Sequence, residues 1–171
     1  MRPNGQPFDP YAILAALDRH GVSYIVIGAF ARVIQGTEEI TRGVDVVPSL
    51  RSENLRRLTL ALEELGAERT DGQALTIDEA TIHDEPLLDL DTRAGELKIV
   101  TKPAGTRGGY DDLRRAATRE PIGKGLRPQV AAIRDLARMV AALGREQDQP
   151  ILYQLRYLAE LERGLTRGIE R

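Results

Sequence analysis

The chain has 171 residues, with 24 Lys and Arg against 26 Asp and Glu and 42% hydrophobic residues, which fits one soluble globular domain. It contains no cysteine, which excludes disulfide frameworks, thiolate zinc sites, iron–sulfur ligation and thiol nucleophiles. We find no signal-like segment and no apolar run near the length of about 18 residues that spans a membrane, so we expect a cytoplasmic protein.

The near-neutral total charge conceals a change of sign along the chain. Residues 53–92 carry eleven acids against three Arg, whereas residues 93–145 carry twelve bases against five acids. The basic stretch has two interpretations: contact with the phosphates of tRNA or another nucleic acid, or the solvated faces of two helices. Within residues 107–138 Tyr110 is the one aromatic residue, which argues against stacking of bases.

The first half of the chain alternates between helical and strand-like patterns, which predicts an α+β domain. Asp followed by Pro is typical of a helix start, and glycine is typical of a helix end. In chain order we expect a helix from Asp9-Pro10 to Gly21, a strand over Ser23–Ile27, a helix over Ala29–Gln35, a strand over Val44–Val47 and a long helix from Ser52 to Gly66.

The second half begins with a predicted β-hairpin. Its strands are Pro86–Asp91 and Glu96–Thr101, and side-chain alternation places Asp89 and Lys98 on one face together with Asp91 and Glu96. After the hairpin we expect a short helix over Tyr110–Ala117, a helix over Ile133–Leu143 and a last helix from Ile151. Residues 1–131 should form the α/β core, and residues 132–171 a helical segment packed on it within a single domain.

The chemical signal lies in the segment 27–31, Ile-Gly-Ala-Phe-Ala, and in the segment 41–47, Thr-Arg-Gly-Val-Asp-Val-Val. A glycine between a strand and a helix lets the backbone approach phosphate oxygens, and the helix offers unpaired N–H donors there. Carboxylates two residues apart on a strand point to the same side, where they can hold Mg²⁺. Asp45 stands at such a position.

These two segments resemble the nucleotidyltransferase superfamily, especially its minimal nucleotidyltransferase and AbiEii-like toxin branches. The segment Gly95–Val100 is similar to the strand that supplies a third acid in that superfamily, and Asp135–Val140 with Arg145 and Asp148 is similar to one of its helices. The resemblance covers most of Ser23–Asp148. It implies a mixed β-sheet of the nucleotidyltransferase type, flanked by helices, with a helical C-terminal segment.

Several positions depart from the pattern of the superfamily. Gly43 stands where the first strand carboxylate is expected, Lys98 replaces the third acid, and Val140 replaces a Lys. Ala29 stands where a second Gly or a Ser is expected. Because a Lys ammonium repels a divalent cation and one acid does not assemble a two-metal site, we predict a degraded metal-binding motif.

The resemblance still implies a set of candidate site residues. The candidate catalytic residues are Asp45 and Lys98; the candidate nucleotide-binding residues are Gly28, Ala29, Arg32 and Thr41; further candidates of the cleft are Asp89, Glu96, Arg145 and Asp148. No metal site is expected, and Asp45 is the one ligand if a metal binds. We hypothesise that Lys98 lies where the metal would be, neutralised by Asp45 and Asp89.

Two functions follow from the resemblance. In the first, the chain is a degraded member, related to toxin–antitoxin systems, that keeps the fold as a binding or regulatory module for a nucleotide, an antitoxin or another partner protein. In the second, it is an active AbiEii-like enzyme that transfers a nucleotidyl group from an NTP with Mg²⁺ to a nucleic acid or protein. The missing carboxylates favour the first function.

Overall fold

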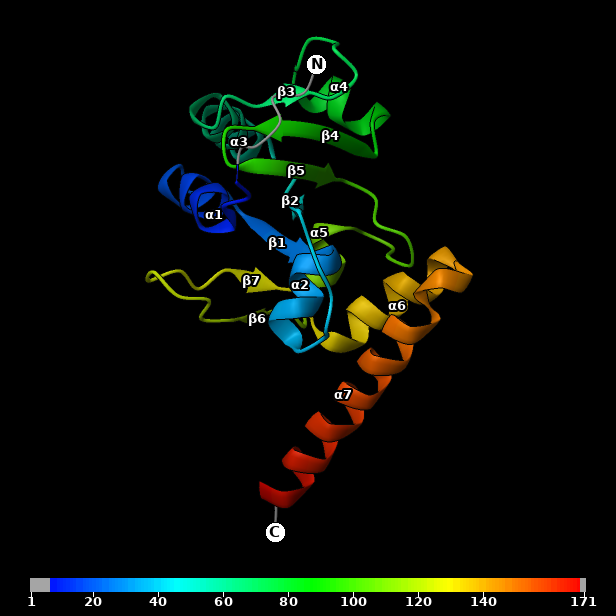
Figure 1. The fold of residues 1–171 in the computed structure, drawn as a ribbon. Helices are drawn as coiled ribbons and strands as arrows, with labels where there is room; N and C mark the ends of the chain where they lie inside the picture. The colour runs from blue at the N-terminus through cyan, green and yellow to red at the C-terminus, as the bar shows by residue number, and fades with distance from the viewer. Residues whose placement is uncertain (1–6, 170–171) are drawn as a thin grey trace.

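A mixed seven-stranded sheet in the order β3-β4-β5-β2-β1-β7-β6 organises the computed structural model, which describes residues 7–169 (Figure 1). Strand β1 is antiparallel to β2, β2 is parallel to β5, and β5 is antiparallel to β4. The strands are β1 Tyr24–Ile27, β2 Gly43–Pro48, β3 Glu68–Arg69, β4 Leu87–Thr92, β5 Gly95–Val100, β6 Thr118–Arg119 and β7 Gln129–Val130. The predicted α+β class, with a mixed sheet flanked by helices, is confirmed.

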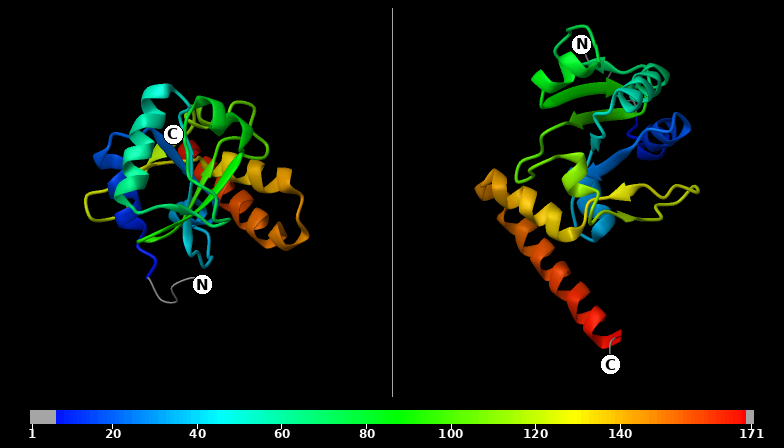
Figure 2. Two further views of the ribbon diagram at one scale, coloured as in Figure 1. Left: turned by 90° about the horizontal axis from the view of Figure 1, so that it is seen from above. Right: turned by 180° about the vertical axis from the view of Figure 1, so that it is seen from behind.

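The helices lie on both faces of this sheet (Figure 2). They are α1 Pro10–Arg19, α2 Gly28–Gln35, α3 Ser52–Glu64, α4 Glu79–Asp84, α5 Tyr110–Leu113, α6 Ile133–Leu143, the 3₁₀ helix η1 Glu146–Asp148 and α7 Gln149–Ile169. Helix α1 starts where the sequence predicts, because the Asp9 side chain accepts a hydrogen bond of 3.1 Å from the Ala12 N–H.

Alternation along β2 decides which face of the sheet is buried. Val44 and Val46 are fully buried and face the layer of α1 and α3, together with Leu97 and Ile99 of β5. Asp45 points to the other face and is half-buried. The second face is also apolar where β1 and β2 pair, since Ile25 and Val47 are fully buried there, and it carries polar side chains at the β4–β5 end of the sheet.

The structure differs from the sequence prediction in short elements. The helix expected over Tyr110–Ala117 ends at Leu113, and a turn over residues 114–116 leads from it to strand β6, which pairs with β7. Strands β3, β6 and β7 have two residues each, too few to show an alternating pattern, and none of them was predicted. Helix α3 starts at Ser52 as predicted, but no side-chain hydrogen bond caps its first turn.

Helix α7 starts against the body of the molecule and then leaves it (Figures 1 and 2). Leu152 and Leu155 are buried, whereas Leu165 is 71% exposed and Ile169 is 85% exposed. The first half of the helix packs beside α6, and the second half has solvent around it. No helix of the described part of the chain is long and apolar enough to cross a membrane.

Candidate functional site

Three charged side chains lie in one row across the middle of the sheet. Asp45 of β2 is in register with Lys98 of β5, and Lys98 is in register with Asp89 of β4. Paired residues of neighbouring strands point to the same face, so Lys98 stands between Asp45 and Asp89 in the row. The register Asp91–Glu96 confirms that the four predicted charged residues of the hairpin share a face. We call the row Asp45–Lys98–Asp89 the charged row.

The carboxylate of Asp45 packs against Gly28, at the turn where β1 passes into α2. Gly28 has φ +71°, and a Cβ atom placed on it would lie 2.4 Å from Asp45 Oδ2. The positive φ and this close approach both require glycine. No side chain caps the first turn of α2, to which Ala29 also belongs, so a carboxylate at this end is favoured by the helix dipole.

Burial controls the ionisation of Asp45. Desolvation raises the pKa of this carboxyl above its ordinary value, Lys98 and Arg32 oppose the rise, and Asp89 and Glu96 add to it. Within residues 7–169 no hydrogen bond or ion pair joins Lys98 to Asp45 or Asp89. Lys98 therefore acts on Asp45 through its electric field rather than through direct contact.

Close packing explains the glycine at position 43. A Cβ atom on Gly43 would lie 2.9 Å from the Glu96 Cβ and 2.9 Å from the Glu96 carbonyl oxygen. The atoms that this Cβ would meet include backbone of the paired strand β5, which moves less readily than the end of a flexible side chain. A carboxylate at position 43 would require β2 and β5 to separate.

Arg32 is held by a partner that the sequence did not reveal. Its Nε donates to Glu39 Oε2 at 2.9 Å and its Nη2 donates to Glu39 Oε1 at 2.7 Å, while the Thr37 hydroxyl donates to Oε2 at 2.7 Å. Burial alone would raise the pKa of Glu39, but these hydrogen bonds lower it below its ordinary value. Through Glu39, Arg32 thus stabilises the connection between α2 and β2. That Arg32 contacts a nucleotide phosphate stays a prediction.

The other predicted residues occupy the surroundings of this connection. The Thr41 hydroxyl donates to the Gly43 carbonyl oxygen at 2.9 Å, which fixes the entry to β2. Arg145 Nε lies 2.6 Å from Asp148 Oδ2 in a local ion pair, and the charge of Asp148 acts on Glu39. Asp148, with its partner Arg145, therefore lies near Glu39. Neither residue is part of the charged row.

The donor set does not fit the divalent metal of the superfamily. Among residues 7–169 no group of three or more His, Cys, Asp or Glu side chains is arranged to hold a metal ion. Lys98 occupies the middle of the charged row, and Gly43 has no space for the carboxylate that would complete the pair with Asp45.

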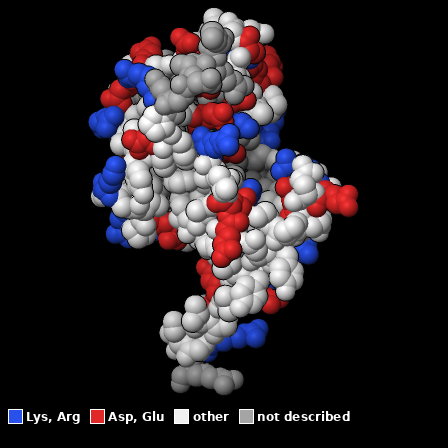
Figure 3. Space-filling view, in the orientation of Figure 1, with Lys and Arg blue, Asp and Glu red and all other residues white. Residues whose placement is uncertain are grey.

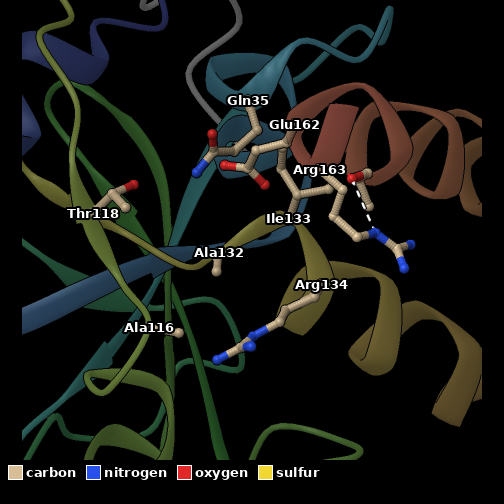
Figure 4. A pocket seen from close by; sticks show the side chains of 9 residues that line it. Gln35, Ala116, Thr118, Ala132, Ile133, Arg134, Glu162 and Arg163 are labelled. Atoms are coloured by element: carbon tan, nitrogen blue, oxygen red, sulfur yellow. Dashed lines mark hydrogen bonds between the residues drawn. The ribbon is translucent and has the colours of Figure 1, made fainter. Parts of the chain in front are cut away.

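Two hollows of the surface are relevant to ligand binding. On the face shown in Figure 3, acidic and basic side chains adjoin one another over β5 and β2, beside a hollow that separates them from the α6–α7 end. A separate pocket of about 620 Å³ is lined by Gln35, Arg134 and Glu162, among others, and contains none of the predicted site residues (Figure 4). The charged row, and not this pocket, is therefore the candidate site.

The architecture is that of the nucleotidyltransferase fold. No protein-family model and no curated protein sequence matches the chain. A Thermotoga maritima protein assigned as a nucleotidyltransferase is similar over 88% of this chain and 90% of its own, with 16% identity and a TM-score of 0.56. The lincosamide antibiotic adenylyltransferase LnuA covers 89% of this chain and 99% of its own, with 13% identity and a TM-score of 0.61.

A third similar structure is the antibiotic-resistance factor ANT(2'')-Ia, in a complex with adenylyl-2''-tobramycin. It covers 94% of this chain and 96% of its own, with 15% identity and a TM-score of 0.51. At these identities the likeness concerns the fold alone. The superfamily fold expected from the sequence is thereby confirmed, whereas activity and substrate are not part of what the likeness shows.

Proposed function

We propose that this chain is a nucleotidyltransferase-fold binding or regulatory module that does not carry out metal-dependent nucleotidyl transfer. One observation carries the proposal: Lys98 lies in register between Asp45 and Asp89, where an active enzyme needs a carboxylate. An ammonium in this place repels a divalent cation and balances part of the negative charge of the row. The packing of Gly43 against β5 supports the same conclusion.

The ligand of the module would meet Asp45 and the first turn of α2. The N–H groups of this turn, beginning at Gly28 and Ala29, have no side-chain cap and form the part of the site suited to a nucleotide phosphate. We extend the proposal to the AbiEii-like branch, in which the module would act through a partner protein such as an antitoxin.

A second function has its own supporting observation. Asp45 is a half-buried carboxylate with a raised pKa, and Asp89 and Glu96 lie near enough to influence it. Perturbed carboxylates that gather at one place are typical of active sites. On this basis the second candidate is an active enzyme that transfers a nucleotidyl group from an NTP to a small molecule, a nucleic acid or a protein.

Thermal melting with each NTP, with and without Mg²⁺ or Mn²⁺, separates the two functions. A ligand at 100 times its Kd stabilises the folded protein by about 2.7 kcal/mol, which is a visible shift in Tm. We expect any shift with a nucleotide to be the same with metal and with EDTA. A shift that requires metal and is abolished by Asp45→Asn would support the enzyme and contradict the module.

A further inference from the structure

A second polar groove lies at the end of β1 and β2 that is opposite to Asp45. A pocket of about 240 Å³ there is lined by Ser23, Arg51, Arg57, Tyr110 and Arg114, among others. A pocket of about 420 Å³ shares Ser23 and Tyr110 and continues to Arg119. The two pockets meet at these shared residues, and we call them together the Tyr110 groove.

Arginines from three segments of the chain line the Tyr110 groove. Arg51 precedes α3 and Arg114 follows α5, and the side chains of both are exposed without a hydrogen bond or ion pair to any residue in the range 7–169. Arg57 lies on α3, and Arg119 in β6 donates to the Arg127 carbonyl oxygen at 3.2 Å. Guanidinium groups that converge from different elements suit phosphate oxygens, which they bind through paired N–H donors.

The acids that line the Tyr110 groove are mostly engaged. Glu53 forms ion pairs with Arg56 and Arg57 on the same helix. Asp18 accepts a hydrogen bond of 2.8 Å from the Tyr24 hydroxyl. Asp111 is the remaining acid of the lining, and it is exposed at the rim. The four arginines of the lining outnumber its three acids, so the formal charge of the groove is positive, although the whole chain is slightly acidic.

Tyr110 indicates which class of phosphate-containing ligand suits the Tyr110 groove. This residue lines both pockets and so lies where they join, half-buried at the start of α5. In the sequence Tyr110 is an isolated aromatic residue. The fold brings Arg51 and Arg57, from a distant part of the chain, into the same pocket lining. A flat ring among guanidinium groups is the arrangement by which proteins hold single-stranded nucleic acid, with a base on the ring and the flanking phosphates on the arginines.

We propose that the Tyr110 groove binds single-stranded nucleic acid. Arg51 and Arg114 hold phosphates on its outer part, and Tyr110 stacks on a base where the two pockets join. The site is separate from the charged row, so it does not depend on the function proposed for Asp45.

Fluorescence anisotropy of the full chain with labelled oligonucleotides tests the proposal. We expect single-stranded probes of about 12 nucleotides to bind more tightly than a duplex of the same length. The logarithm of the association constant should fall with the logarithm of salt concentration by about 0.7 for each phosphate contacted. Equal or tighter binding of the duplex would overturn the proposal, as would displacement by inorganic phosphate as effective as displacement by unlabelled oligonucleotide.

Substitutions then locate the site. The double variant Arg51→Gln/Arg114→Gln should bind about tenfold more weakly, and its salt dependence should be shallower by about 1.4 because two phosphate contacts are lost. Tyr110→Leu should weaken binding about fivefold or more and leave the salt dependence unchanged. The matched control is Arg107→Gln/Arg115→Gln, which removes the same charge from two exposed arginines outside the groove lining. An equal loss in the control, or none in the Arg51 and Arg114 variant, would contradict the proposal, provided that each variant melts like the parent.

Discussion

The Asp45 carboxylate occupies the volume that a side chain at Gly28 would need, since a Cβ atom there would lie 2.4 Å from Asp45 Oδ2. Neither residue is therefore independent of the other: the glycine admits the carboxylate, and the carboxylate excludes any larger residue. This mutual fit links the end of β1 to the middle of β2.

Gly28→Ala should destabilise the protein by about 1–3 kcal/mol through its left-handed backbone, and by more because of the clash with Asp45. Gly72→Ala is the matched control, because Gly72 has φ +78° but no atom within 4 Å of the added Cβ. In an Asp45→Ala background the cost of Gly28→Ala should fall towards that of Gly72→Ala in the parent, since of these Asp45 atoms only the Cβ, 3.1 Å away, remains. Urea melts of the four variants measure this coupling, and fully additive effects would contradict it.

Asp45→Asn should raise Tm at neutral pH. Desolvation raises the pKa of Asp45 in the folded protein above the ordinary 3.8, so the ionised carboxylate destabilises the fold at neutral pH. As pH falls through the raised pKa towards 3.8, the parent becomes protonated and the advantage of the variant should vanish. Melting curves between neutral and acidic pH test this, with the exposed Asp84→Asn as control. A variant that is less stable than the parent at neutral pH would show that the charge of Asp45 stabilises the fold.

Arg32→Gln should destabilise the protein by roughly 3 kcal/mol at neutral pH, because it leaves Glu39 charged and shielded from water. The side chains of Arg32 and Glu39 are only 16% and 12% exposed, so solvent replaces little of the lost interaction. The double variant Arg32→Gln/Glu39→Gln should recover part of the loss.

The same ion pair has a pH signature. Because the folded-state pKa of Glu39 is lowered, the stabilisation by this carboxylate is complete above 4.5 and is lost as pH falls through the lowered value. Glu39→Gln should therefore cost stability at neutral pH and progressively less in acid. A cost of Glu39→Gln that does not change with pH would argue against an ionised pair.

Lys98→Asp should create affinity for Mn²⁺. The change places a third carboxylate between Asp45 and Asp89 in the charged row, on a face that already carries Asp91 and Glu96. Oxygen ligands in such a row are what hard divalent cations bind. We expect Mn²⁺ to raise the Tm of the variant and not that of the parent or of Lys102→Asp, an exposed control. An equal Mn²⁺ effect on the parent would contradict the role assigned to Lys98.

The parts of the fold that the sequence predicts are those with long periodic patterns. Helices α1, α3 and α6 and the β4–β5 hairpin have enough residues for their apolar spacing to be read. Strands β6 and β7 have two residues each, and their pairing depends on tertiary contacts that no local pattern records.

The candidate site was predictable as a list of residues but not as a geometry. The alternation of the hairpin predicts that Asp89 and Lys98 share a face, and the register confirms it. Nothing in the local sequence pairs Arg32 with Glu39, since the two residues belong to a helix and to the loop that follows it. The tight packing at Gly43 was equally hidden, because it depends on a strand more than fifty residues away.

The loop between α2 and β2 is tied to the C-terminal helix as well as to Arg32. The Glu38 N–H donates to Gln154 Oε1 of α7 at 3.0 Å, and Gly36 lies against Leu158. The first half of α7 is thus attached to the segment that leads into β2 and Asp45, whereas its second half is exposed to solvent. A displacement of α7 would therefore disturb the entry to β2, the strand that carries Asp45.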